Sequence, residues 1–296
     1  SEAIPPPATV PPERVGFNDF PVDPDGVIRR NLLFADANTT PNSETLYSFS
    51  LRLALAYLEA EAILPVQSDV NPRYLALDGT DFYPIGPHFG GYRSIDNAGY
   101  QIMLQYRSQT DSVERLSLSD LLSGQFTNSM IRDRIVIIGT TAPSAKDLFY
   151  TPFSEAAAID HLMPGVVLHV QATSQLLSHV LNEQPLPWQF PEALEIAWIL
   201  LASGTGGALG WYARRLWILG LSIIGGGLIW VGIPALAFTA GGWLPVLSAN
   251  AAFVSSLVVI ALYRTRQNPK TAIGQSLTFA TAPPPTALPG MSEKQT

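Results

Sequence analysis

The sequence contains no cysteine in 296 residues, which excludes disulfide bonds, thiolate catalysis and cysteine-based metal sites. Its four histidines are scattered, without an H-E-x-x-H motif or a paired spacing. Protein zinc sites use such grouped ligands. We therefore expect no metal site and no cofactor.

Basic residues are also scarce, and they are distributed unevenly. Residues 1–190 contain 11 Lys and Arg against 21 Asp and Glu, a net charge of −10, whereas residues 191–296 contain six basic and three acidic residues. No basic patch is present that could displace counterions from phosphates, which argues against a nucleic-acid partner. The split in charge indicates two different environments.

No signal peptide is visible in these 296 residues. The sequence begins with Ser1 rather than Met and has no N-terminal apolar run, so we expect a processed chain or a fragment. Residues 1–14, rich in proline and small residues, are predicted to form a linker.

Long apolar stretches are present at residues 193–211, 216–238 and 243–263. At 1.5 Å per residue, each can cross a hydrocarbon core of about 30 Å. Three such stretches joined by loops of about four residues are not typical of a soluble protein. We expect an all-α bundle of three transmembrane helices over residues 191–263, embedded in a lipid bilayer. Residues 264–296 are expected to be a disordered tail.

The loops predict the orientation of these helices. Arg214 and Arg215 follow the first helix, Arg264 and Arg266 follow the third, and the loop at 239–242 carries no charge. Positive residues favour the cytoplasmic side. The tail is therefore expected to be cytoplasmic, and residues 1–190 extracytoplasmic.

Glycines within the apolar stretches predict close helix packing. Gly206 and Gly210 are four residues apart and share one helix face, and residues 225–227 form a second small surface. Pro234 is expected to kink the second helix.

Residues 15–190 have the pattern of an α/β domain. A hairpin is predicted from strands at 15–20 and 27–34 around Asp23-Pro24-Asp25-Gly26. Further predicted elements are a helix at 44–62, short strands at 74–77, 81–85 and 102–106, and a short helix at 118–123 capped by Ser117 or Ser119.

The clearest unit lies later in this domain. Residues 134–139 (R-I-V-I-I-G) form a continuous apolar run, typical of a strand buried on both faces. A polar loop follows at 140–153, and a helix is predicted at 166–181. A strand, loop and helix in this order are half of a βαβ unit.

Several motifs together resemble the CHASE family of type two, the cyclase- and histidine-kinase-associated sensory extracellular domains. They are P-D-G-V-I-R-R at 24–30, Q-Y-R at 105–107, S-L-S-D-L-L-S-G at 117–124, I-V-I-I-G-T-T-A-P at 135–143, D-L-F-Y-T-P-F at 147–153 and M-P-G-V-V-L-H at 163–169. The resemblance implies a bacterial extracytoplasmic input module in the inner (plasma) membrane, coupled to a separate output. It covers residues 15–263 and implies that only the later, C-terminal part of such an α/β domain is present.

The candidate ligand site is the loop after the predicted strand and the start of the following helix. Its residues are Thr140, Thr141, Ser144, Lys146, Asp147, Thr151 and His169. Exposed amides, hydroxyls and an acid at a strand end could hold a small polar ligand, because ligands gather there in α/β folds. The alternative is structural: the hydroxyls satisfy loop backbone, Asp147 pairs with Lys146 or Arg134, and His169 is a satisfied helix histidine.

Catalysis has less support. Ser144, Asp147 and His169 are the residue types of a hydrolase triad, but Ser144 lacks a G-x-S-x-G elbow and no enzyme activity is expected. Arg29 and Arg30 are expected to form a solvated or ion-paired strand edge.

Two functions stay open. The first is a membrane-anchored sensory module, expected as a homo-oligomer or within a larger membrane complex. It would respond to an unknown small molecule or protein and pass its state through the stiff Pro185–Pro187 connection. The second is a structural subunit whose outer domain docks onto a larger membrane complex.

Overall fold

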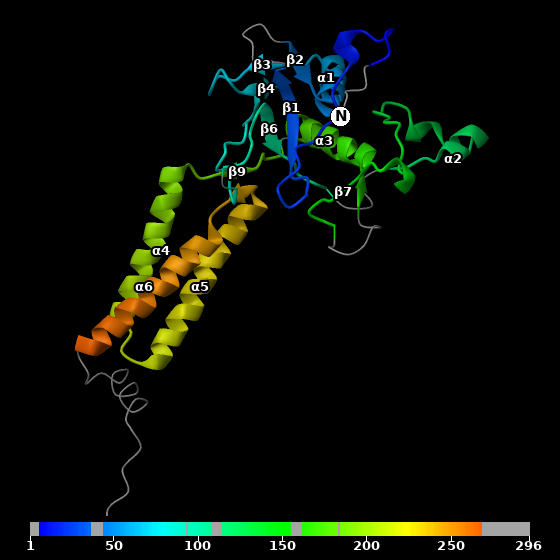
Figure 1. Ribbon diagram of the computed structural model, residues 1–296. Coiled ribbons are helices and arrows are strands. Elements are labelled where there is room, and N and C mark those ends of the chain that lie inside the picture. The colour runs from blue at the N-terminus through cyan, green and yellow to red at the C-terminus, as the bar shows by residue number, and fades with distance from the viewer. Residues whose placement is uncertain are drawn as a thin grey trace, which may run out of the picture. The chain divides into compact units, whose positions relative to one another are not determined.

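The computed structural model describes residues 6–36, 44–92, 94–107, 114–154, 162–182 and 184–267. The chain divides into two compact units, Ser1–Pro187 and Trp188–Thr296. The first unit mixes small sheets with helices, and the second contains three long helices (Figure 1). The predicted fold class, an α/β region followed by three apolar helices, is confirmed. Most of the predicted tail, residues 268–296, lies outside the described residues.

The central sheet of the first unit is antiparallel and has the order β2-β1-β6, with bounds Thr45–Tyr47, Arg30–Asp36 and Tyr100–Met103. The predicted turn before β1 is confirmed, because Gly26 N donates to Asp23 O at 2.8 Å and Gly26 has a φ of +83°. The predicted strand at 15–20 is wrong, because this segment makes only one bridge, between Phe17 and Ser48.

Two helices, α1 (Phe49–Ala60) and α3 (Gly165–Leu181), pack together with this sheet around one apolar core. The predicted helix at 44–62 begins later than expected. Ser48 Oγ accepts from Leu51 N at 3.2 Å and caps α1, while residues 45–47 pair with β1 instead. Its core residues include Leu33 of β1, Leu51 and Leu58 of α1, Ile102 of β6 and Leu176 of α3, together with Phe82.

The remaining strands of the first unit are short and also antiparallel. One sheet contains β3 (Val66–Gln67), β4 (Leu75–Leu77) and β5 (Thr80–Phe82), and a two-stranded ribbon joins β7 (Leu148–Phe149) to β8 (Met163–Pro164). The short strands predicted near 74–77, 81–85 and 102–106 correspond to β4, β5 and β6, with small shifts in their ends.

Helix α3 carries many buried polar side chains. Two of them, Gln171 and Gln175, make hydrogen bonds to the backbone of residues 103–107, as a neighbouring strand would. Gln175 Nε2 donates to Met103 O at 2.8 Å and its Oε1 accepts from Gln105 N at 3.1 Å. Gln171 Oε1 accepts from Arg107 N at 3.1 Å. These amides satisfy the backbone beyond the end of β6, which would otherwise be costly to bury.

The predicted strand at 134–139 is wrong in this structure. Residues 135–139 have no strand assignment; Val136 is 53% exposed and Ile138 is 91% exposed. A continuous Val/Ile run forms a buried strand only when neighbouring strands and covering layers are available, and no described strand pairs with this segment. The predicted half βαβ unit is therefore absent from the described part of the chain.

Short elements complete the first unit. The predicted helix at 118–123 is confirmed as α2 (Leu118–Ser123), with Ser117 Oγ accepting from Asp120 N at 3.1 Å and Gly124 closing it in a left-handed conformation. Three 3₁₀ turns, η1 (Pro12–Arg14), η2 (Asn128–Met130) and η3 (Pro143–Ala145), lie in the loops.

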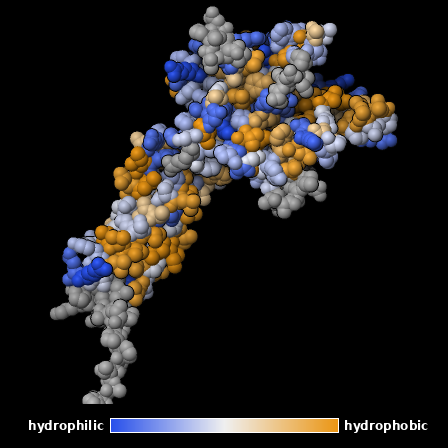
Figure 2. All heavy atoms as spheres, in the orientation of Figure 1, coloured by the Kyte–Doolittle hydropathy of each residue, from blue (hydrophilic) through white to orange (hydrophobic). Residues whose placement is uncertain are grey.

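The second unit contains α4 (Glu192–Tyr212), α5 (Leu216–Thr239) and α6 (Val246–Gln267). Each is long and apolar enough to cross a membrane, and Figure 2 shows apolar side chains over their visible outer surface. Strands β9 (Trp188–Gln189) and β10 (Gly242–Trp243) form a short parallel pair beside the α5–α6 turn. There Trp188 N donates to Gly241 O at 2.9 Å.

Close packing of α4 on α6 depends on the glycines noted in the sequence. A Cβ on Gly206 would lie 2.2 Å from Phe253 O, and one on Gly210 would lie 2.3 Å from Leu257 O. Gly226 of α5 faces the Phe253 ring in the same way, at 2.1 Å. The prediction of glycine-mediated helix contacts is confirmed at these three positions.

Candidate functional site

The N-terminal turn of α3 is the centre of the candidate site. Gly165 N donates to Asp147 O at 3.0 Å, and a Cβ on Gly165 would lie 2.5 Å from both carboxylate oxygens of Asp147. The Asp147 carboxylate therefore lies directly against the start of the helix, where the helix dipole favours negative charge. Only a glycine at position 165 leaves room for it.

His169 follows one turn later, on the same side of α3 as Gly165. Its ring lies between two aromatic rings, with centroid distances of 4.8 Å to Phe20 and 5.2 Å to Phe49. The side chain is 9% exposed, and its Nδ1 has no hydrogen-bond partner in the described part of the chain. A buried ring nitrogen without a partner is unfavourable, so the site has an unused hydrogen-bonding group.

The charge state of His169 is set by two opposing effects. Burial lowers the pKa of His169 below its ordinary value, because the charged form loses its hydration. The nearby Asp147 carboxylate and a hydrogen bond with the Asn18 backbone oppose this shift without cancelling it. The imidazole is thus neutral at pH 7, and it can donate one hydrogen bond and accept one.

The structure brings together only part of the predicted site. Thr140, Thr141, Ser144 and Lys146 are all exposed in the loop, and Thr140 Oγ1 accepts from Ala142 N at 3.2 Å. Thr151 is buried, but its amide donates to Ser154 Oγ at 3.0 Å within its own turn. The structural interpretation thus fits Thr140 and Thr151, whereas Asp147 lies against the start of α3 and its charge acts on His169.

A hydrolase triad receives no support from this geometry. No hydrogen bond between Ser144 and His169 is present among the described residues. The described residues also contain no group of three His, Asp or Glu side chains that could hold a metal ion. His161 lies outside the described residues.

A buried ion-pair network around Asp23 and Arg30 was not predicted from the sequence. Arg30 is 4% exposed, and its Nε donates to Asp23 Oδ1 at 2.7 Å while its NH1 donates to Gln101 Oε1 at 2.7 Å. Tyr92 and Arg29 donate to Asp23 Oδ2 at 2.6 and 3.0 Å. The ion-paired interpretation of the two arginines is correct, but Arg30 is buried and not solvated.

An open groove of about 580 Å³ lies beside the central sheet. Its lining combines apolar and acidic residues, among them Phe20, Leu32, Ala35, Asp19, Asp36 and Asp96. Phe20 is shared with the His169 site, because the same ring lies against the imidazole. The carboxylates would disfavour an anion in the groove and favour a cation or a neutral polar molecule.

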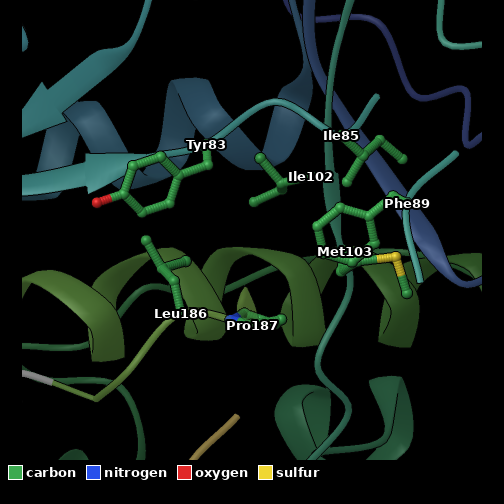
Figure 3. Close-up of a pocket in the computed structure, with 7 residues that line it drawn as sticks. All are labelled: Tyr83, Ile85, Phe89, Ile102, Met103, Leu186 and Pro187. Atoms are coloured by element: carbon green, nitrogen blue, oxygen red, sulfur yellow. The ribbon is translucent and has the colours of Figure 1, made fainter. Parts of the chain in front are cut away.

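A second, closed hollow shows how the end of the first unit packs. Leu186 and Pro187 lie against Tyr83, Ile102 and Met103 (Figure 3). The enclosed volume is about 10 Å³, roughly the space for one water molecule. This hollow is too small for a ligand and is a packing contact of the segment that precedes the second unit.

Comparison with known proteins identifies one relationship. The family model of the CHASE2 domain matches residues 2–208, which include the whole described first unit and most of α4. Searches among curated proteins and among solved structures found no match.

Proposed function

The chain belongs to the CHASE2 family of sensory extracellular domains, and from this membership we propose that its first unit is an input module that binds a small polar ligand outside the cytoplasm. The binding residues are His169 and Asp147 at the start of α3. The helices α4–α6 anchor the unit in the bacterial inner membrane, with residues 264–296 in the cytoplasm. The module has no catalytic activity of its own.

The observation that supports this site is the unpartnered Nδ1 of His169. A ligand that exchanges a hydrogen bond with this atom would remove the cost of burying it, so binding would be specific for a polar group at that position. Phe20 separates the ring from the groove, and a movement of this one side chain would open a path to it.

The experiment uses the full chain purified from membranes in mild detergent. Native mass spectrometry should detect a bound small molecule in the wild-type protein, and His169→Ala should lose it. Thr141→Ala, which changes an exposed loop residue, is the matched control and should keep it. Retention of the molecule by H169A, with loss in T141A, would move the site to the exposed loop.

Transmission through the membrane would use the connection at the end of the first unit. Leu186 and Pro187 pack within the first unit, and the next residue, Trp188, is held by backbone and side-chain hydrogen bonds in the second unit. In this proposal the proline-containing connection, Pro185–Pro187, carries a shift in the first unit to α4. With Pro185–Pro187 replaced by a long Gly/Ser linker, bound ligand should no longer change hydrogen exchange in the first turns of α4.

A structural docking subunit is the second candidate. It is favoured by the apolar side chains of α2 and by Val136 and Ile138, which are exposed in the first unit. Purification of the chain at fixed stoichiometry with a different membrane protein, and without a bound small molecule, would support this candidate over the sensory module.

A further inference from the structure

Residues 114–142 form a long described segment in which no residue is buried, although it is rich in large apolar side chains. Leu118 and Leu122 of α2 are 69% and 79% exposed, and Ile138 is 91% exposed. Figure 2 shows apolar side chains gathered over α2. Exposed apolar groups of this kind on one continuous segment mark an interaction surface.

The backbone of residues 135–139 is also without partners. In the described part of the chain, no hydrogen bond uses the backbone of these five residues. A Val/Ile segment with free amides and carbonyls on its edges has the properties of an unpaired edge strand. Pairing with another strand would satisfy both the backbone groups and the side chains.

One end of this segment is fixed to the fold. A Cβ on Gly139 would lie 2.6 Å from Val166 Cβ and Cγ2, so the backbone of Gly139 lies directly against the first turn of α3. The side chains then alternate: Ile135 and Ile137 are half-buried, whereas Val136 and Ile138 are exposed. The segment is held in place with one face and both edges available.

We propose that residues 135–139 pair with the same segment of a second copy of this chain, as two antiparallel strands related by a two-fold axis at Ile137. In this register Val136 of one copy faces Ile138 of the other, so the exposed side chains of both copies form one apolar face. Ile135 and Ile137 of both copies remain on the opposite face. This pairing does not depend on a ligand at His169.

Charge permits pairing with a second copy and selects the direction of that pairing. The antiparallel register places Arg134 opposite Thr140, Asp133 opposite Thr141 and Arg132 opposite Ala142, so no like charges meet across the pair. A parallel pair in register would place each of these charged residues beside its own copy, which is unfavourable. Self-pairing in register is thus free of like-charge repulsion in the antiparallel direction only.

Single cysteines test the register, because the chain has none of its own. With the full chain in membranes, Ile137→Cys should form a disulfide-linked dimer at least about tenfold faster than Val70→Cys, a control at a 73% exposed position of the same unit. Directly opposite Cβ atoms lie about 4.5–5.5 Å apart in a strand pair. Val136→Cys should cross-link efficiently with co-expressed Ile138→Cys and poorly with itself.

A charge-reversal of the apolar face gives an independent readout. In the cysteine-free chain, the double change Val136→Lys and Ile138→Lys places Lys opposite Lys and should reduce the dimer fraction in native mass spectrometry at least about tenfold. Val70→Lys should leave it unchanged. Equal cross-linking rates for I137C and V70C, efficient V136C self-cross-linking, or a mixed disulfide of I137C with a different polypeptide would each overturn the proposal.

Discussion

Arg30 illustrates how far a single residue of this chain depends on distant partners. Its guanidinium reaches Asp23, seven residues away, and also Asp96 O and Gln101, which are 66 and 71 residues away. The adjacent Arg29 instead pairs with Asp23 and with the exposed Asp25. The sequence presents both as one Arg-Arg pair, and only the tertiary structure separates the buried one from the accessible one.

Replacing these arginines should therefore have unequal effects. Arg30→Met leaves the buried Asp23 with fewer compensating partners and should destabilise the first unit by about 3 kcal/mol. Arg29→Met removes the exposed pair with Asp25 and one of several partners of Asp23, and should cost less, about 1 kcal/mol. Hydrogen exchange of the β1 amides in the full chain measures both changes, and equal losses of protection would contradict the distinction.

The buried histidines predict a pH dependence of stability. Burial lowers the pKa of both His169 and His179. Below the unfolded pKa of about 6.5, the unfolded chain binds more protons than the folded one, so stability is complete above this pH and falls as pH decreases. Each histidine contributes at most about 1.4 kcal/mol per pH unit.

The measurement compares hydrogen exchange of α3 at pH 7.5 and pH 5, corrected for the intrinsic exchange rate. His169→Gln and His179→Gln should each reduce the loss of protection at the lower pH. A loss of unchanged size in both variants would mean that other groups produce the pH dependence.

At the scale of the elements, the sequence correctly predicted the features that depend only on neighbouring residues, such as helix caps and turns. The cap at Ser117 and the turn at Gly26 are formed by neighbouring residues, and both were predicted from the sequence. The start of α1 was misplaced because residues 45–47 pair with β1, an interaction that a helical pattern does not reveal. The run at 134–139 failed for the same reason: a strand is defined by its partners, and its own residues do not supply them.

The candidate site was predictable to a similar extent. Residue type and loop position suggested seven residues, but only Asp147 and His169 lie at the start of α3, because Gly165 lets the carboxylate approach the helix. The remaining five satisfy their own loop or remain exposed. The groove residues Asp19, Asp36 and Asp96 come from separate segments, and no local motif connects them.

The packing of α4 on α6 makes a prediction at the same scale. Gly206→Leu would place a side chain where Phe253 O now lies and should destabilise the helical unit by about 3 kcal/mol. A Cβ at Gly204, two residues earlier, would have no atom within 4 Å, so Gly204→Leu should be nearly neutral. All six tryptophans lie in this unit, so their fluorescence during titration with a denaturing detergent follows its unfolding. Equal stability of the two variants would refute this mode of packing.

For the whole molecule, the arrangement across the membrane is the main prediction. Single cysteines at Asp69 and Gln267, both exposed, should react differently with a thiol reagent that cannot cross membranes. The cysteine at position 69 should react in cells with a permeable outer membrane, and the one at 267 only after the inner membrane is opened, because Arg264 and Arg266 favour the cytoplasmic side. The reverse pattern would invert the topology.

The contact between Gly139 and Val166 has a consequence for the molecule as a whole. Val166 follows Gly165, which touches Asp147, and precedes His169 by three residues, so one helical turn borders both the proposed ligand site and the root of the proposed dimer strand. If ligand binding and self-association both act on this turn, they are thermodynamically coupled, and each changes the equilibrium constant of the other by the same factor. If occupancy at His169 strengthens self-association, then self-association must raise the affinity for the ligand by the same factor. The density of copies in the membrane would then set the concentration at which this protein responds.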